Sequence, residues 1–314
     1  MSSERDGEAG VTTADGGAEV DQAVLDRGLA SLAANRDRPY YDAAADTEAA
    51  KQYYNGVDKT VSGAELMGAL LALVKRTHSQ TPHYKPTDMV YPWVDLHPDR
   101  QLRSIYSGKT FAPEDVIRDD ARSEAERTLR LRDFVSREAA IGPDAFTDEL
   151  DELDALLPYN CEHVVPQSSF AKKEPMRGDL HHLFTCESRC NSFRSNTPYY
   201  DFSDDERVVM QDCGRSEPGE AGRFEPRSGK GAVARATMYF LLRYPGLIGD
   251  ESRELQAERL PILLAWHQAQ PVEEWERHRN AAIFEIQGNR NPLIDNPQWA
   301  SKIPFQTAFG TPGG

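Results

Sequence analysis

The chain has 314 residues and a formal net charge of −15, with 39% hydrophobic and 28% charged residues. This length and composition are typical of a globular protein with one large or two ordinary domains, and they exclude a miniature scaffold. No run of eighteen apolar residues occurs, so we expect no helical membrane span and no membrane partner. Residues 1–6 lack the basic and apolar segments of a secretory signal, and the sequence therefore predicts a cytoplasmic protein.

The negative charge is concentrated in the first half of the chain. Residues 1–155 contain 18 Lys and Arg against 30 Asp and Glu, whereas residues 156–314 contain 18 against 21. The second half is close to neutral, so a local basic cleft for a polyanion remains compatible with it. The overall charge therefore does not exclude an enzyme that acts on nucleic acid.

The N-terminal part, residues 21–155, is expected to be mainly helical. It follows a small, acidic, Gly-rich tail at residues 1–20, whose composition is typical of disorder. Ser62 and Glu65 match the two ends of a capping box, so a helix is expected to begin there. The other features predicted in this part are a helix over residues 21–35, a strand over 101–107, an acidic insertion at about 112–155 and an exposed helix over 122–137.

The C-terminal part, residues 156–305, is expected to combine a small β element with helices and to end in a tail at residues 306–314. Apolar side chains recur at helical spacing in its later segments. The elements predicted here are strands over residues 208–212 and 224–226 and helices over 231–244, over 260–268 and from Pro271 onward. The predicted fold class is α+β, a mostly helical single domain with a small β element.

The middle of the chain collects the residue types that metal-assisted phosphodiester hydrolysis requires. Glu162 and the side-chain oxygen of Asn191 are hard oxygen donors of the kind that magnesium prefers. His163 titrates near neutrality when it is unperturbed, which suits a general base for water. Arg177 and Arg194 are the candidates for a contact to phosphate. These residues predict a site that combines a cation, a base and phosphate donors.

Motifs in the order found in a known nuclease family occur along most of the chain. They are Ile105–Gly108, Glu162–Pro166, Asp179–Leu183, Asn191 with Arg194 and Asn196, Lys230–Gly231 and Gln287–Pro292. This series resembles the bacterial endonuclease I family of ββα-metal nucleases, which are also called His-Me finger nucleases. The resemblance covers roughly residues 50–300.

The resemblance implies a ββα-metal core, with a strand carrying His163, a second strand through residues 180–184 and a helix that presents Asn191. His163 would be the general base for water, and Glu162 and Asn191 would be the magnesium ligands. Arg177 falls where family members place an arginine that contacts phosphate. Family members cut DNA, and often RNA, with little sequence preference and leave 5′-phosphates. The predicted function is a magnesium-dependent, largely sequence-nonspecific endonuclease for DNA, with RNA as a second candidate substrate.

Several neighbouring residues receive narrower roles. His181 aligns with a family position and is predicted to orient the catalytic groups, while His182 is predicted to be structural. Arg194 and Asn196 are predicted to contact nucleic acid, and Asp179 is expected to hold a partner in place. Internal contacts rather than nucleic-acid contacts are expected for Tyr199 and Tyr200 and for Arg235, Arg279 and Arg290.

All four cysteines lie in or beside the central motifs, and three arrangements are open for them. The favoured one is a structural zinc ion held by Cys161, Cys186, Cys190 and Cys213, slightly ahead of plain buried thiols. Disulfides come third, because a cytoplasmic protein is expected to keep its thiols reduced. Zinc held by four thiolates has no open position and would not be the catalytic ion.

Two other functions compete with the nuclease. One is a catalytically inactive, zinc-braced module that binds nucleic acid, although such a module has no chemical need to keep Glu162, His163 and Asn191 together. The other is a thiol hydrolase in which Cys161 is the nucleophile and His163 the base, because residues two apart on a strand share a face. The extended motif series favours the nuclease, with nucleic acid as its partner and a monomer as its expected state.

Overall fold

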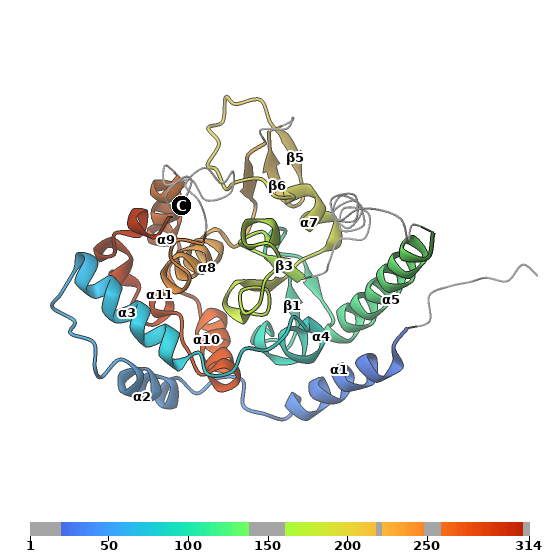
Figure 1. The fold of residues 1–314 in the computed structure, drawn as a ribbon, viewed down its shortest axis with the longest axis horizontal. Coiled ribbons are helices and arrows are strands. Elements are labelled where there is room, and N and C mark those ends of the chain that lie inside the picture. The colour runs from blue at the N-terminus through green and yellow to red at the C-terminus, as the bar shows by residue number, and fades with distance from the viewer. Residues whose placement is uncertain (1–19, 138–160, 218–221, 248–258, 310–314) are drawn as a thin grey trace, which may run out of the picture.

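The computed structural model describes residues 20–137, 161–217, 222–247 and 259–309, and it shows an α+β fold that is mostly helical (Figure 1). The tail expected at residues 1–20 and the later part of the acidic insertion therefore lie almost entirely outside the described residues. Among the described helices, none is long and apolar enough to cross a lipid bilayer.

Helices make up most of the described chain. The longer ones are α1 (Gln22–Asn35), α2 (Ala43–Tyr53), α3 (Gly63–Thr77), α5 (Pro113–Arg137), α8 (Lys230–Arg243), α9 (Leu260–Ala269) and α10 (Glu274–Gln287). The short ones are α4 (Pro86–Met89), α7 (Ser188–Arg194) and α11 (Pro292–Asp295), the π-helix η1 (Val90–Val94) and the 3₁₀ helices η2 (Gln167–Phe170), η3 (Leu180–His182), η5 (Pro297–Lys302) and η6 (Phe305–Ala308).

Within the described ranges, short antiparallel strands form three small sheets. The strands are β1 (Leu102–Arg103) with β2 (Thr110–Phe111), β3 (Cys161–His163) with β4 (Leu183–Thr185), and β5 (Val209–Gln211), β6 (Gly214–Ser216) and β7 (Phe224–Pro226) in that order. In the central pair, Glu162 of β3 lies opposite Phe184, and His163 lies opposite Leu183. Helix α7 follows β4 directly and contacts β3, so two strands and a helix surround the motif residues.

Helix α8 forms the centre of the larger hydrophobic core. Every residue from Gly231 to Leu242 is buried, because α9, α3, η3 and η6 pack around this helix. Figure 1 shows α8 between α9 and the strand β3. Tyr239 of α8 and Tyr244, the C-cap of this helix, both donate to Asp179 in the segment that leads into β4, so the core directly supports the motif residues.

The structure changes several predicted boundaries. Ser62 is the N-cap of α3, but its side chain makes no capping hydrogen bond, and the capping box expected there is not formed. A capping box is instead present at the start of α10, between Glu273 and Glu276. Helix α5 begins at Pro113, well before the predicted helix at residues 122–137. The tail predicted from residue 306 is ordered at its start, because Ala308 is buried in the core.

Candidate active site

Glu162 lies in the middle of β3 with one carboxylate oxygen fully engaged. Its Oε1 accepts hydrogen bonds from Tyr106 Oη at 2.7 Å and from Arg194 Nη1 at 3.1 Å. Burial raises the pKa of Glu162 to about 7, and Arg194 and Tyr106 oppose this rise. No described residue donates a hydrogen bond to Oε2, so this second oxygen is the one that a cation can use.

Arg194 ties α7 to β3 and thereby places Asn191. Its Nη2 donates to Val164 O at 3.0 Å, and its guanidinium also lies 5.0 Å from the centre of the Tyr199 ring. Helix positions three apart share a face, so the half-buried Asn191 lies on the side of α7 that faces β3. The structure therefore brings Glu162 and Asn191 to neighbouring elements of one small unit.

The predicted nucleic-acid contact of Arg194 is wrong. Arg194 is only 1% exposed and is held by Glu162 and by the carbonyls of His163 and Val164. Its guanidinium is therefore a structural partner of Glu162. Asn196 is exposed, and its contact with nucleic acid stays a prediction.

His163 has a defined tautomer in the structure. Its Nε2 lies 3.0 Å from Arg177 O, and because a carbonyl oxygen only accepts, Nε2 carries the proton. The unprotonated Nδ1 forms no hydrogen bond with the described residues. Burial first, and then the neighbouring His182, lower the pKa of His163 well below its ordinary value, so the ring is neutral at pH 7.

Tyr84 packs on the His163 ring and was not identified from the sequence. The two rings are stacked with centroids 4.9 Å apart, and the Arg177 guanidinium lies 5.2 Å from the Tyr84 ring centre. Arg177 is half-buried, and its Nε donates to Gln167 Oε1 at 3.0 Å. One tyrosine thus contacts both the candidate base and the candidate phosphate ligand. No motif pointed to Tyr84, because it lies far from both residues in the chain.

The structure places His182, rather than His181, against His163. The His163 and His182 ring centroids are 5.4 Å apart, and His182 Nε2 donates to Met176 O at 2.6 Å. The His181 ring packs 4.4 Å from Tyr239, and burial lowers its pKa to about 3. Both histidines were expected on a strand, but they lie in the 3₁₀ helix η3, which precedes β4.

Asp179 holds η3 in place, as expected. Its Oδ2 accepts from Tyr239 Oη and Tyr244 Oη, both at 2.9 Å. Its Oδ1 accepts from His181 N and from Gln287 Nε2, both at 3.1 Å. Although burial alone would raise it, the pKa of Asp179 lies below its usual range, because neighbouring imidazoles and these donors favour the carboxylate.

Buried arginines serve internal contacts, as expected. Arg279 donates to Asp95 and to the carbonyls of Leu180 and Leu183, so α10 fixes the segment that contains η3 and the start of β4. The other internal pairs are Arg235 with Glu276 and Arg290 with Asp46 and Asp295. Tyr199 is 1% exposed and packs internally as well.

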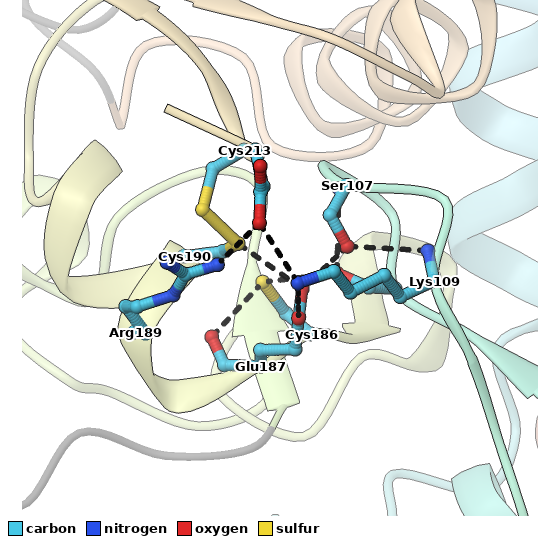
Figure 2. The surroundings of a disulfide bond; sticks show 9 residues. Ser107, Lys109, Cys186, Glu187, Arg189, Cys190 and Cys213 are labelled. Atoms are coloured by element: carbon cyan, nitrogen blue, oxygen red, sulfur yellow. Dashed lines mark hydrogen bonds and ion pairs between the residues drawn. A yellow bond between two sulfur atoms is a disulfide. The ribbon is translucent and has the colours of Figure 1, made fainter. Parts of the chain in front are cut away.

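The four-cysteine zinc site is corrected by the structure. Cys190 on α7 and Cys213 beside β6 form a disulfide with a Cα–Cα distance of 5.3 Å, and Cys161 and Cys186 are buried free thiols. Figure 2 shows this disulfide next to Glu187 and Lys109. Two of the four thiols are therefore unable to bind zinc, and the described residues contain no cluster of three or more histidine, cysteine or acidic side chains that could hold a metal ion.

Cys161 is not suited to act as a nucleophile. Its side chain is fully buried, and this burial raises the pKa of the thiol well above its ordinary value. The thiolate is the reactive form of cysteine, so this environment disfavours the thiol hydrolase hypothesis.

Comparison with known proteins identifies relatives among the nucleases. The family model for Endonuclease I matches residues 83–298. The "Extracellular ribonuclease" of Bacillus subtilis (strain 168) is 35% identical over 159 residues, covering 46% of this chain and 54% of the relative. The "Periplasmic deoxyribonuclease" of Aeromonas hydrophila is 31% identical over 154 residues, covering 43% of this chain and 62% of the relative. The "Endonuclease-1" of Buchnera aphidicola subsp. Acyrthosiphon pisum (strain APS) is 26% identical over 152 residues, covering 42% of this chain and 58% of the relative.

These relatives overturn the predicted cytoplasmic location, because the names of two of them place those proteins outside the cytoplasm. A disulfide was placed third among the cysteine arrangements because the protein was predicted to be cytoplasmic. The wrong location therefore also led to the wrong preference for the cysteines. The chain spans about half the length of the first of these relatives. The family model matches more than half of the chain, from before β1 to η5, and it includes β3, β4 and α7: the chain belongs to the Endonuclease I family.

Proposed function

We propose that the chain is a magnesium-dependent endonuclease of low sequence specificity that hydrolyses phosphodiester bonds in DNA, with RNA as a second substrate. One observation carries the proposal: adjacent residues of β3 offer a carboxylate oxygen, Glu162 Oε2, and an imidazole nitrogen, His163 Nδ1, that no described residue engages. Family membership and the names of the relatives point to the same chemistry.

The donor set fits a magnesium ion. Glu162 and Asn191 supply a carboxylate and an amide oxygen, and magnesium accepts one or two protein oxygens while it keeps several waters. When bound, the ion would neutralise phosphate charge and stabilise the leaving oxygen. Tyr106 and Arg194 hold Glu162 by Oε1 and therefore orient Oε2 before any ligand arrives. The β3, β4 and α7 unit would then be a ββα-metal core.

His163 is suited to take a proton from water. Its neutral ring at pH 7 leaves Nδ1 able to accept, while the bond from Nε2 to Arg177 O keeps the ring from turning. As the water oxygen bonds to phosphorus, its proton passes to Nδ1, and the bond from phosphorus to the leaving oxygen breaks. The Arg177 guanidinium is the proposed ligand of the phosphate oxygens.

A cleavage assay tests this function. Supercoiled plasmid and RNA are incubated with the full chain in magnesium or in chelator. We expect cleavage that requires the divalent ion and that falls by at least about 100-fold in His163→Ala, the usual contribution of a general base. The matched control is His83→Ala, which removes an exposed histidine and should leave the rate unchanged. Full activity in chelator, or in His163→Ala, rules the mechanism out.

A further inference from the structure

A pocket with a volume of about 410 Å³ lies where the end of α9, the start of α10 and η5 meet. This volume is within the range of about 300–1,000 Å³ that is typical of small-molecule sites. Its polar lining comes from Arg235, His267, Gln268, Arg277, Gln298 and Ser301. No residue of β3 or α7 contributes to it, so the pocket is separate from the candidate active site.

The charges that line this pocket are all basic, although the chain as a whole carries −15. Arg277 is exposed and forms no ion pair with the described residues, so its guanidinium is available to a ligand. Arg235 is 2% exposed and is held rigidly, because Glu276 accepts two bonds of 2.8 Å from it and Gln270 O accepts another of 2.9 Å. One adaptable and one fixed guanidinium therefore share a single pocket.

Two further polar side chains of the lining are also available to a ligand. The side chains of Gln268 and Gln298 are exposed and make no hydrogen bonds with the described residues. His267 is buried, its Nε2 donates to Pro297 O at 2.9 Å, and its Nδ1 is a buried atom without a partner. Because Nε2 carries the proton, Nδ1 only accepts, so His267 offers no donor to a phosphate oxygen, and the polar partners left to a ligand here are Gln268 and Gln298.

A neighbouring pocket differs from this one in the acidic residues that line it. That pocket, of about 260 Å³, shares Arg235 and Pro271, but Arg103 and the acidic residues Glu273 and Glu276 also line it. Glu273 would repel an anion there, and Glu276 is already paired with Arg235, whereas the larger pocket has no acidic residue among its lining residues. The larger pocket is therefore the one that fits an anion.

We infer that the pocket between α9, α10 and η5 is a phosphate-binding site in which Arg277 is the principal charged ligand. The planar guanidinium forms paired hydrogen bonds with phosphate oxygens, and the amide groups of Gln268 and Gln298 add donors on two sides. The phosphate has two sources, a free phosphate ion or a backbone phosphate of nucleic acid. The second source rests on the proposed function.

Calorimetric titration of the full chain with inorganic phosphate, in chelator and at constant ionic strength, tests the site. We expect one phosphate per chain and an affinity about tenfold lower in Arg277→Gln, as for the loss of charged hydrogen bonds. The matched control is Arg76→Gln, which removes an exposed arginine on α3 without an ion pair among the described residues. No saturable binding, or equal affinity in Arg277→Gln and the unsubstituted chain, overturns the inference.

A second titration separates the sources. It uses a short single-stranded oligonucleotide without terminal phosphates, in chelator, so that no cleavage occurs. If Arg277→Gln weakens oligonucleotide binding, the pocket takes a backbone phosphate, and if only inorganic phosphate is affected, it takes the free ion. Because neither titration requires catalysis, phosphate binding without cleavage refutes only the proposed function, and cleavage without phosphate binding refutes only this inference.

Discussion

The arrangement around Glu162 shows how single hydrogen bonds prepare a carboxylate for a cation. Tyr106 and Arg194 both donate to Oε1, and Tyr199 Oη, 2.7 Å from Tyr106 Oη, donates in turn to Tyr106. Burial raises the pKa of Glu162 and so favours the protonated carboxyl group, which binds cations poorly, whereas Arg194 and Tyr106 oppose this rise. Tyr106 is therefore a positioning residue for the proposed metal ligand.

Replacing Tyr106 should weaken magnesium binding. Tyr106→Phe removes one hydrogen bond, worth about 1 kcal/mol, so we expect the magnesium dissociation constant to rise about fivefold. Calorimetric titration with magnesium measures this constant directly. Tyr200→Phe, at a half-buried ring packed against Phe202, is the control and should not change it. An unchanged constant in Tyr106→Phe would remove Tyr106 from the site.

Buried neutral histidines should make the fold sensitive to acid. His181 takes a proton below about pH 6.5 when the chain is unfolded, but only near pH 3 when it is folded. Between these values the unfolded state binds more protons, so the free energy of unfolding falls as the pH falls. From pH 7 to pH 5, this one group should cost about 2 kcal/mol.

Denaturant unfolding at pH 7 and pH 5 checks this effect. In His181→Phe, which keeps an aromatic ring beside Tyr239, the loss of stability between the two pH values should be smaller by that amount. The exposed-position control His83→Gln should behave like the unsubstituted chain. Equal pH slopes in His181→Phe and the unsubstituted chain would show that His181 is not buried as described.

At the scale of elements, the position of α7 depends on three links to neighbouring segments. Arg194 joins its C-terminal end to β3, and the Cys190–Cys213 disulfide joins it to the sheet of β5, β6 and β7. Arg189 of α7 also forms an ion pair with Asp212, which precedes Cys213 and pairs with Lys109 as well. The helix that carries Asn191 is therefore held from both sides.

The disulfide should contribute measurably to stability. It closes a loop of 23 residues, for which loss of the bond is expected to cost about 3 kcal/mol. A reductant should lower the free energy of unfolding of the unsubstituted chain by that amount, but it should leave Cys213→Ser unaffected. A thiol titration of the unfolded, unreduced chain should find the two free cysteines. Four reactive thiols would contradict the bond.

The sequence predicted an element well where apolar side chains recur along one face of a helix or strand. Strand β7 was placed correctly, and the predicted helices over residues 231–244 and 260–268 agree with α8 and α9 to within a residue. The second central strand was placed too early, because Asp179 caps a short turn through its bond from His181 N and delays the strand until Leu183. Such local capping competes with an extended backbone and is hard to recognise in a sequence.

Contacts between distant segments account for the errors in the site. Arg194 was predicted to contact phosphate because its actual partner, Glu162, is 32 residues away in the chain. No motif in the sequence indicates that these two residues pair. The sequence showed four cysteines but not that Cys190 lies next to Cys213 in space. Glu162, His163 and Asn191 were identified from an ordered motif series, and their catalytic roles stay predictions.

At the scale of the whole molecule, charge opposes a polyanionic substrate. The chain carries −15, and the internal pairing of Arg194, Arg235, Arg279 and Arg290 withdraws four arginines from the surface. Added salt screens long-range repulsion as well as local attraction, so the two effects partly cancel. The proposed enzyme should therefore depend on few phosphate contacts.

Salt should consequently weaken substrate binding only modestly. Between about 50 and 200 mM salt, we expect KM for DNA to rise less than about tenfold, whereas proteins with 6–10 phosphate contacts lose about 10³–10⁵ in affinity. Initial rates at constant magnesium concentration measure this dependence. A rise of a thousandfold would indicate an extensive basic surface that the charge distribution does not suggest.

The carbonyls of Met176 and Arg177, which receive the protons of His182 and His163, are neighbours in one connecting segment. Every amino acid supplies a carbonyl, so Met176 can be exchanged for another residue without loss of this acceptor. Adding or deleting a single residue would shift both acceptors along the chain together. The register of this segment, more than the identity of its side chains, is what variants and engineered versions of the protein must preserve.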